Sequence, residues 1–212
     1  MMKSFILCGG LGTRLNLTVP KILAKVKNKT ILEIQVEFLK KYSDNITLLT
    51  GYKNEHLKQY IKSLNLKEIY SKPTGTSDAI KSALRSLNDS ERVLFIYGDI
   101  YPDIDLNDFL NSDTNKEIHL CIHKSKHPED SDLIKFENNK LISVIKKPHS
   151  EKSGYSSCCL FLTDKRILKY QGKDFMKDIL EQADVSVYLT DSEMLDLGTP
   201  ERLKYANDKN SI

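Results

Sequence analysis

The sequence has no tryptophan, few cysteines and no long apolar run. Its four cysteines, Cys8, Cys121, Cys158 and Cys159, show no CxxC spacing and two of them are adjacent, which disfavours both a zinc knuckle and a disulfide framework. No stretch approaches the ~20 apolar residues of a membrane span, and the apolar run at residues 4–8 is too short for a signal peptide. We therefore expect a cytoplasmic protein that has no membrane partner.

Blocks of charge of one sign are also missing. The 32 Lys and Arg residues and the 29 Asp and Glu residues are spread along the chain, and the formal net charge is +3. Because nucleic-acid-binding domains gather their basic residues on one arm or face, we expect no nucleic-acid partner. No repeat or proline-rich linker divides the chain, and its length suits one sizeable core, so residues 1–212 are expected to form a single domain.

Short apolar runs alternate with longer segments of helical period in the first half of the chain. This alternation is typical of parallel strands joined by crossover helices. The predicted strands are residues 5–8, 46–50, 93–97 and 118–122, and the predicted helices are residues 31–39, 54–64 and 77–87. Strands are then predicted at residues 133–136, 141–145 and 158–162, a helix around 175–182 and a strand near 185–189. The pattern predicts an α/β fold with a doubly wound, mostly parallel sheet and a strand-rich second half.

Gly9, Gly10 and Gly12 directly follow the first predicted strand, at the end where open α/β sheets bind ligands. Glycines let backbone N–H groups approach a phosphate closely, and Arg14 adds a planar set of donors for phosphate oxygens. A tight turn would require the same glycines for steric reasons alone. The segment is not a P-loop, because no Gly-Lys-Ser/Thr occurs, and Leu15 takes the third glycine position of the dinucleotide fingerprint. The loop alone leaves a turn and a phosphate site equally open.

Residues 9–15, Gly-Gly-Leu-Gly-Thr-Arg-Leu, followed by Pro20-Lys21, resemble the signature of the sugar-1-phosphate nucleotidyltransferases. Further segments resemble motifs of that family in the same order: residues 51–55, Gly75-Thr76 with Ala79, Tyr97-Gly98-Asp99, Lys147-Pro148 and residues 195–201. The short chain most resembles the compact heptose- and mannose-1-phosphate guanylyltransferases. The resemblance implies a Rossmann-like core that joins a nucleoside triphosphate, with GTP favoured, to a sugar 1-phosphate and releases pyrophosphate.

The resemblance also implies roles for individual residues. Arg14 and Lys21 would be catalytic cations on the triphosphate, Lys147 would bind the sugar phosphate, and Asp99 and Asp196 would hold Mg2+. The implied nucleotide-binding residues are Leu7, Gly9, Gly10, Gly12, Thr13, Gly75 and Thr76. Magnesium suits this arrangement because it prefers a few carboxylates together with phosphate oxygens and water.

Each of these residues also has a purely structural interpretation. Gly-Asp ends many strands, so Asp99 could be a turn residue, and Asp196 precedes a Gly-Thr-Pro turn. Thr76 could cap the helix that follows it, and Lys21 could be a solvated lysine. His119, Cys121 and His123 alternate along one predicted strand and superficially suggest a soft metal site, but without a fourth ligand a core or surface role is favoured.

The match departs from the family in three places. Residues 16–19 form a shorter segment than usual, Lys146 replaces the Glu of Glu-Lys-Pro, and Ser156-Ser157-Cys158 replaces Asn-Ala-Gly. The last two changes lie at the acceptor end. Two other functions therefore stay open: a CTP-dependent cytidylyltransferase that acts on a phosphorylated alcohol, and a non-catalytic regulatory subunit that binds nucleotide sugars. A homo-oligomer is compatible with the sequence.

Overall fold

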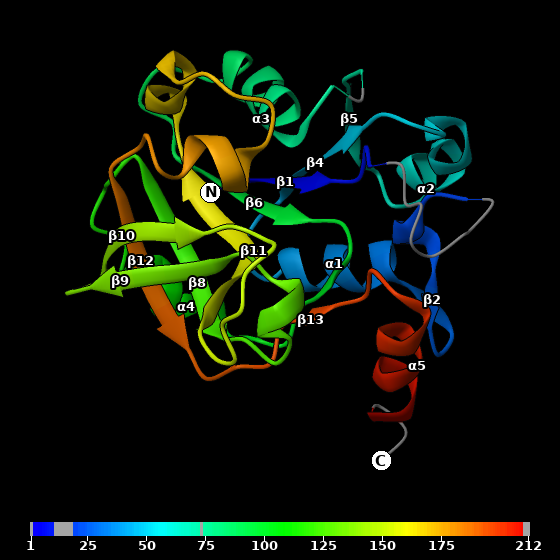
Figure 1. The fold of residues 1–212 in the computed structure, drawn as a ribbon. Helices are drawn as coiled ribbons and strands as arrows, with labels where there is room; N and C mark the ends of the chain where they lie inside the picture. Colours follow the sequence, from blue (N-terminus) through cyan, green and yellow to red (C-terminus); the bar gives the residue numbers. More distant parts are fainter. Residues whose placement is uncertain (1, 11–18, 73, 210–212) are drawn as a thin grey trace.

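A mixed β-sheet forms the centre of the protein (Figure 1). The structure is a computed structural model that describes residues 2–10, 19–72 and 74–209. Within these residues the strands of the sheet are β1 (Lys3–Leu7), β4 (Asn45–Thr50), β5 (Lys67–Tyr70), β6 (Val93–Tyr97), β8 (Ile118–Lys124), β9 (Leu133–Glu137), β10 (Lys140–Ile145), β11 (Tyr155–Thr163) and β12 (Val185–Thr190). Their spatial order is β5-β4-β1-β6-β11-β8-β12-β10-β9.

Helices and two short ladders complete the described chain. The α-helices are α1 (Ile31–Leu39), α2 (Lys58–Ser63), α3 (Thr76–Arg85), α4 (Leu106–Asn111) and α5 (Pro200–Lys209). The shorter helical turns are η2 (Lys21–Leu23), η3 (Asn54–Leu57), η4 (Pro128–Asp130), η5 (Lys165–Lys169) and η6 (Phe175–Ile179). The ladders are β2 (Lys25–Val26) with β3 (Lys29–Thr30) and β7 (Ile100–Tyr101) with β13 (Leu195–Asp196). No helix of the described residues is long and apolar enough to cross a membrane.

The sheet reverses its strand order beside β1. The chain passes from β1 to β4 and β5 on one side and then returns to β6 on the other, and these four strands are parallel. Beyond β6 the sheet is mixed: β11 runs antiparallel to β6 and β8, whereas β12 is parallel to β8. Ligands of open α/β sheets bind at such a reversal, outside the carboxyl ends of the strands.

Helices cover both faces of the sheet (Figure 1). Helix α1 lies on one face, and α3 with η6 lies on the other. Phe5, Phe95 and Phe161 occupy matching register positions of β1, β6 and β11 on the second face, and their ring centroids are 5.0 and 5.2 Å apart. Phe175 of η6 stacks on Phe161 at 4.3 Å. This column of rings joins the two halves of the chain in one core.

The structure confirms the α/β fold class and most of the predicted elements. The helix at residues 31–39 is found at these bounds, because Thr30 and Glu33 form a capping box: the Glu33 amide donates to Thr30 Oγ1 at 3.2 Å and the Thr30 amide to Glu33 Oε2 at 2.7 Å. The predicted helix at residues 54–64 is divided into η3 and α2. The prediction missed β5, α4 and α5.

His119 is a core residue, as the sequence favoured. Its ring is buried and stacks on Phe109 with centroids 4.8 Å apart, and its Nδ1 lies 2.7 Å from Ser186 Oγ. Burial lowers the pKa of the imidazole, so it stays neutral at pH 7. Among the described residues no group of three His, Cys, Asp or Glu side chains forms a metal site.

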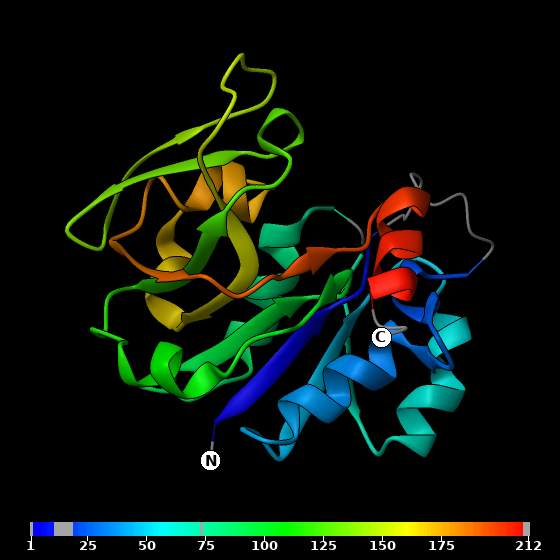
Figure 2. The same ribbon diagram turned by 90° about the horizontal axis from the view of Figure 1, so that it is seen from below.

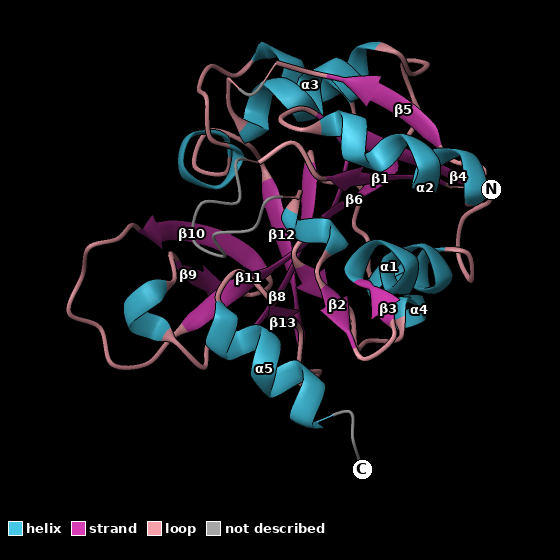
Figure 3. Ribbon diagram, turned by 90° about the vertical axis from the view of Figure 1, so that its right-hand side faces the viewer, coloured by secondary structure: helices cyan, strands magenta, loops and turns pink. Residues whose placement is uncertain are grey.

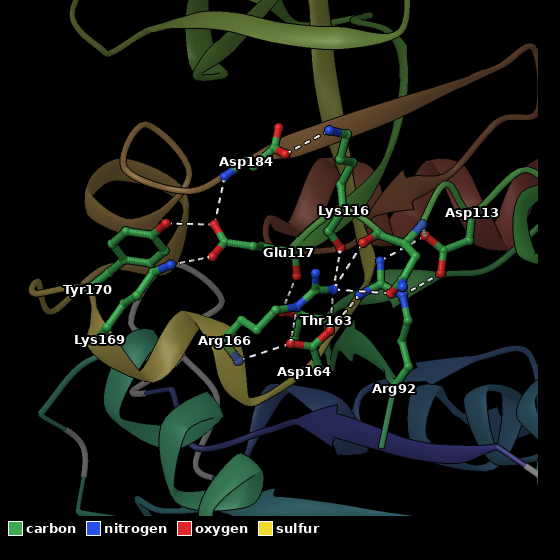
Figure 4. A network of polar contacts seen from close by, with 11 residues as sticks. Arg92, Asp113, Lys116, Glu117, Thr163, Asp164, Arg166, Lys169, Tyr170 and Asp184 are labelled. Carbon is green, nitrogen blue, oxygen red and sulfur yellow. Dashed lines mark hydrogen bonds and ion pairs between the residues drawn. The ribbon is translucent and has the colours of Figure 1, made fainter. Parts of the chain in front are cut away.

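A network of ion pairs closes the end of the sheet that lies opposite the carboxyl ends of the parallel strands (Figure 4). Arg92, just before β6, pairs with Asp113 and also contacts Asp164 Oδ2 at 3.0 Å. Arg166 donates to the same Asp164 oxygen at 2.7 Å. Glu117, just before β8, accepts from Lys169 and from Tyr170, both at 2.6 Å. The network joins the starts of two strands to the end of β11.

Asp164 is the centre of this network, and its removal is expected to destabilise the fold. Burial alone would raise the pKa of its carboxyl, but Arg166 and Arg92 outweigh burial and hold this pKa below its ordinary value. We expect Asp164→Asn to lower the free energy of unfolding at pH 7 by about 1.5–3 kcal/mol, measured by urea denaturation. Because the folded pKa is lowered, the difference should shrink as the pH falls below about 4.

Asp89→Asn is the matched control, because Asp89 is fully exposed and pairs only at the surface with Lys165 at 2.9 Å. It should leave the unfolding curve unchanged. An equal loss in both variants would contradict the central role of Asp164.

Candidate active site

A cleft with a volume of about 420 Å³ opens where the strand order reverses. Its walls come from the carboxyl ends of β1, β4 and β6, from the start of α3 and from β13. The predicted site residues that line it are Leu7, Gly9, Gly10, Lys21, Gly75, Thr76, Asp99 and Asp196. Gly12, Thr13 and Arg14 lie outside the described residues. The fold therefore brings segments that are far apart in sequence to one edge of the sheet.

Close backbone contacts fix the shape of this cleft. Gly51, at the end of β4, packs so tightly on Gly9 that a Cβ would lie 3.0 Å from the Gly9 carbonyl oxygen. Gly75 has a φ of +155°, and a Cβ there would lie 2.2 Å from the carbonyl oxygen of Lys173. Gly75 therefore requires glycine, and at Gly51 a side chain would push the two loops apart by a few tenths of an ångström. Thr76 accepts a hydrogen bond from the Phe175 amide at 2.9 Å, which anchors the start of α3 to η6.

Asp99 and Asp196 meet through the ladder of β7 and β13. Asp196 is the register partner of Ile100, and the Leu197 amide donates to the Asp99 carbonyl oxygen at 2.8 Å. Both carboxylates line the same cleft. The sequence could not place the two side chains relative to each other without the family resemblance, because the ladder pairs a segment from the middle of the chain with one near its end.

Each of these carboxylates faces a cation of the chain. Lys21 forms an ion pair with Asp99. Asp196 accepts from Arg202 Nη1 at 2.6 Å through Oδ2 and from the Gly198 amide at 2.7 Å through Oδ1. Two carboxylates, with no third His, Cys, Asp or Glu ligand among the residues that the structure describes, fit a magnesium ion that takes its other ligands from phosphate oxygens and water. The residues present therefore suit a metal that arrives with a nucleotide.

A second cleft, with a volume of about 770 Å³, adjoins the first. Ile100, Asp132, Cys159, Met176 and Asp196 line both clefts and so form their shared boundary. The remaining wall of the second cleft carries hydroxyl and charged groups, among them Ser125, Ser131, Ser156, Ser157, Lys126, Asp130, Glu193 and Arg202. This cleft can offer many hydrogen bonds to a polar ligand.

Cys159 forms part of the boundary between the clefts. Strand β11 shifts its register between Ser157 and Phe161, and within this irregularity Cys159 has a φ of +54°. Glycine is favoured in that conformation, so Cys159 rather than Cys158 occupies the position where the backbone suits a glycine. Burial, followed by the charges of Asp99 and Asp196, raises the pKa of the Cys159 thiol, which therefore stays neutral.

Lys147 is not among the described residues that line either cleft, but it contacts Asp130, which lines the second. Its Nζ donates to the Asp130 carbonyl oxygen at 2.7 Å and lies 3.4 Å from Asp130 Oδ1. Lys146, its neighbour, forms an ion pair of 2.7 Å with Glu181. The two lysines thus have different carboxylate partners. The role of Lys147 toward the acceptor stays a prediction.

Residues 3–211 match the sequence profile of the family described as Nucleotidyl transferase. The chain belongs to this family. It is 29% identical over 216 residues to "D-glycero-alpha-D-manno-heptose 1-phosphate guanylyltransferase" of Campylobacter jejuni, which covers 94% of this chain and 96% of that protein. The protein of the same name from Aneurinibacillus thermoaerophilus is 28% identical, over 97% of this chain and 96% of its own.

The nucleotidyl transferase fold is also found among solved structures. HddC from Yersinia pseudotuberculosis, complexed with GMP-PN, superposes with a TM-score of 0.85 and 22% identity, and the match covers 100% of both chains. This likeness confirms the fold class expected from the sequence. Family membership confirms that the chain is a nucleotidyltransferase enzyme.

Gln35 is a positioning residue of the transferase that the sequence did not reveal. Its side chain is fully buried in α1, and its Nε2 donates to the carbonyl oxygens of Tyr97 at 2.8 Å and Ile100 at 2.7 Å. These carbonyls flank Gly98 and Asp99, so one amide group holds the turn that presents Asp99 to the cleft. In the sequence, this role could be inferred only from the presence of a glutamine among the apolar positions on the buried face of the helix.

Replacing Gln35 should loosen this turn. We expect Gln35→Leu to lower the free energy of unfolding by about 1–3 kcal/mol, because two carbonyl groups lose their donor. Gln35→Glu has nearly the same shape but cannot donate when ionised, so at pH 7 it should be the more destabilised variant. Urea denaturation of both variants measures the effect, and a Gln35→Glu protein as stable as the wild type would contradict this role.

Proposed function

We propose that this chain transfers a nucleoside monophosphate from a nucleoside triphosphate, with GTP favoured, to a sugar 1-phosphate, and releases pyrophosphate in a Mg2+-dependent reaction. The observation that carries the proposal is the pair of adjoining clefts with Asp196 on their boundary. One cleft holds the residues expected to bind the nucleotide, and the other carries serine hydroxyls and charged side chains that can bond an acceptor. The guanylyltransferase names of the two relatives support the choice of base and acceptor.

In this reaction an oxygen of the acceptor phosphate attacks the α-phosphorus of the triphosphate. A new P–O bond forms while the bond to the departing pyrophosphate breaks, and the pyrophosphate takes the bonding electron pair. Positioning and charge neutralisation dominate such a transfer. Asp99 and Asp196 would hold the magnesium ion, which neutralises phosphate charge when it is bound.

The chain itself supplies the other groups. We propose that Lys21, with Arg14, neutralises the triphosphate and that the backbone at Gly9, Gly10, Gly12 and Thr13 contacts its phosphates. Leu7, Gly75 and Thr76 would lie against the nucleoside. The ion pair between the Lys21 ammonium group and Asp99 on the wall of the first cleft supports this role.

The second cleft favours a sugar over a small phosphorylated alcohol as the acceptor. Its volume of about 770 Å³ exceeds that of the first cleft, and four serines line it: Ser125, Ser131, Ser156 and Ser157. Hydroxyl side chains both donate and accept hydrogen bonds, as the hydroxyl groups of a sugar do. Lys147 would stay bonded to Asp130 and add positive charge near the sugar phosphate. We further propose that residues 1–212 act as a single nucleotidyltransferase domain, since both clefts lie on one sheet.

Asp99→Ala tests the metal site. Loss of one of two carboxylate ligands should lower kcat by at least about 100-fold, because less of the phosphate charge is neutralised in the transition state. Pyrophosphate release from a nucleoside triphosphate and an acceptor measures this rate. Asp108→Asn is a suitable control, since Asp108 is an exposed residue of α4 that lines neither cleft. Unchanged turnover in Asp99→Ala would show that Asp99 is not a ligand of the metal.

A matrix of the four nucleoside triphosphates against several phosphorylated acceptors tests the substrates. We expect the highest rate of pyrophosphate release with GTP and a hexose or heptose 1-phosphate. Turnover confined to CTP with phosphocholine or phosphoglycerol would establish the cytidylyltransferase alternative. Binding of a nucleotide sugar in calorimetry without turnover in any combination would instead favour the regulatory role.

A further inference from the structure

Arg202 lines the second cleft and contacts Asp196, a residue of the boundary between the two clefts. Arg202 belongs to the first turn of α5, which follows β13 directly in the chain (Figure 2). Its side chain is only 19% exposed and lines the second cleft. Nη1 contacts Asp196 Oδ2 at 2.6 Å, and Nη2 contacts Asp130 Oδ2 at 2.8 Å. One guanidinium group therefore bridges a proposed metal ligand and a carboxylate of the second cleft.

We propose that Arg202 binds the phosphate of the acceptor in the second cleft, and that it becomes available for this role when Asp196 exchanges it for a divalent cation. The inference rests on the function proposed above and names the residue that holds the acceptor anion. The ligand is a phosphate monoester.

The first argument is that both partners of Arg202 have a second cation. Asp196 gains the metal, and Asp130 keeps Lys147, whose Nζ lies 3.4 Å from Asp130 Oδ1. Burial opposes the charge of Asp130, but Lys147 and Arg202 together hold the pKa of its carboxyl below the ordinary value. When Arg202 turns to a phosphate, neither carboxylate is left without a positive partner. An unpaired charge in a partly buried site would otherwise be costly.

The second argument is position. The acceptor phosphate must meet the α-phosphorus at the boundary between the clefts, and Asp196 lies on that boundary. Arg202 contacts Asp196, so its guanidinium is within reach of both anions. Its planar set of donors suits a phosphate.

Lys126 is the other permanent cation among the described residues of the second cleft, but it is placed differently. It forms an ion pair with Glu193, its side chain is 57% exposed, and its Nζ lies 5.9 Å from the centre of the Tyr205 ring. Since Lys126 pairs with Glu193 rather than with either carboxylate of Arg202, we assign the acceptor phosphate to Arg202.

This exchange makes acceptor binding depend on the metal. In the structure Arg202 contacts Asp196 and Asp130, so a phosphate must compete with both carboxylates. With Asp196 bound to a metal and nucleotide, the phosphate competes with Asp130 alone. The two ligands are thus coupled through one side chain, and by linkage each strengthens the binding of the other.

The test uses Mn2+ as a paramagnetic probe of the metal site and mannose 1-phosphate and inorganic phosphate as probes of the acceptor site. For the wild-type protein, calorimetry should show mannose 1-phosphate binding at least about 10-fold tighter with Mn2+ and a non-hydrolysable GTP analogue than without them. Equal affinity in the two conditions would overturn the exchange.

Arg202→Met should change the two affinities in opposite directions. We expect Mn2+ to bind several-fold tighter in the absence of nucleotide, measured by electron paramagnetic resonance, because Asp196 no longer has a competing cation. Mannose 1-phosphate and inorganic phosphate should bind at least about 10-fold more weakly. For both ligands, the affinities of Arg202→Lys should lie between those of the wild type and Arg202→Met, since lysine keeps the charge but loses the planar donors. If Arg202 had a purely structural role, Arg202→Met would bind both Mn2+ and the phosphate probes more weakly.

Lys204→Met is the matched control, because Lys204 is an exposed residue of α5 that lines neither cleft. It should change neither affinity. If the acceptor matrix gives turnover but Arg202→Met binds mannose 1-phosphate as the wild type does, the inference about Arg202 is wrong while the proposed function stands. If the wild-type protein binds neither phosphate probe in the presence of Mn2+ and the analogue, the inference about Arg202 fails, and if the acceptor matrix also gives no turnover, the proposed function fails with it.

Discussion

The short ladder of β7 and β13 is the contact on which the candidate site depends. It joins a turn from the first half of the chain to a segment near the end, and so brings Asp99 and Asp196 to one edge of the sheet. Both carboxylates meet a lysine or an arginine there. A site that gathers like charges is repulsive unless cations accompany them. The pairs with Lys21 and Arg202 let the site form before any ligand arrives, and the same side chains are then available for phosphates.

Local signals explain which parts of the fold were predictable. Helix α1 was predicted at its bounds because its apolar residues recur with a helical period, and the capping residues Thr30 and Glu33 mark the same start. Strand β5 was missed because it is a short edge strand whose residues are mostly exposed, so it lacks the apolar run of a buried strand. Helix α5 was missed for a related reason, since Ala206 is its only buried residue among those described. Because each element buries few side chains, neither has the periodic apolar pattern from which a strand or helix is predicted.

The candidate site was predictable to the extent that its residues form short motifs. The Gly-Asp turn and the Asp-Leu-Gly-Thr-Pro segment pointed to Asp99 and Asp196, and both line the first cleft. Gln35, Cys159 and Arg202 were not predictable in this way. The role of Gln35 comes from two carbonyls far along the chain, that of Cys159 from a strand irregularity, and that of Arg202 from carboxylates of two separate segments. Only the folded chain creates these contacts.

Helix α5 has a consequence for how such a chain can evolve. It starts at Pro200, shortly after Asp196, and at its other end Asn207 accepts from the Lys27 amide at 2.6 Å, beside β2 (Figure 3). Each residue turns an α-helix by about 100°. One inserted or deleted residue between Asp196 and Arg202 would either swing the guanidinium away from the boundary of the clefts or break the attachment of Asn207. Descendants of this chain can therefore exchange side chains along the helix far more readily than they can change the length of the link before it.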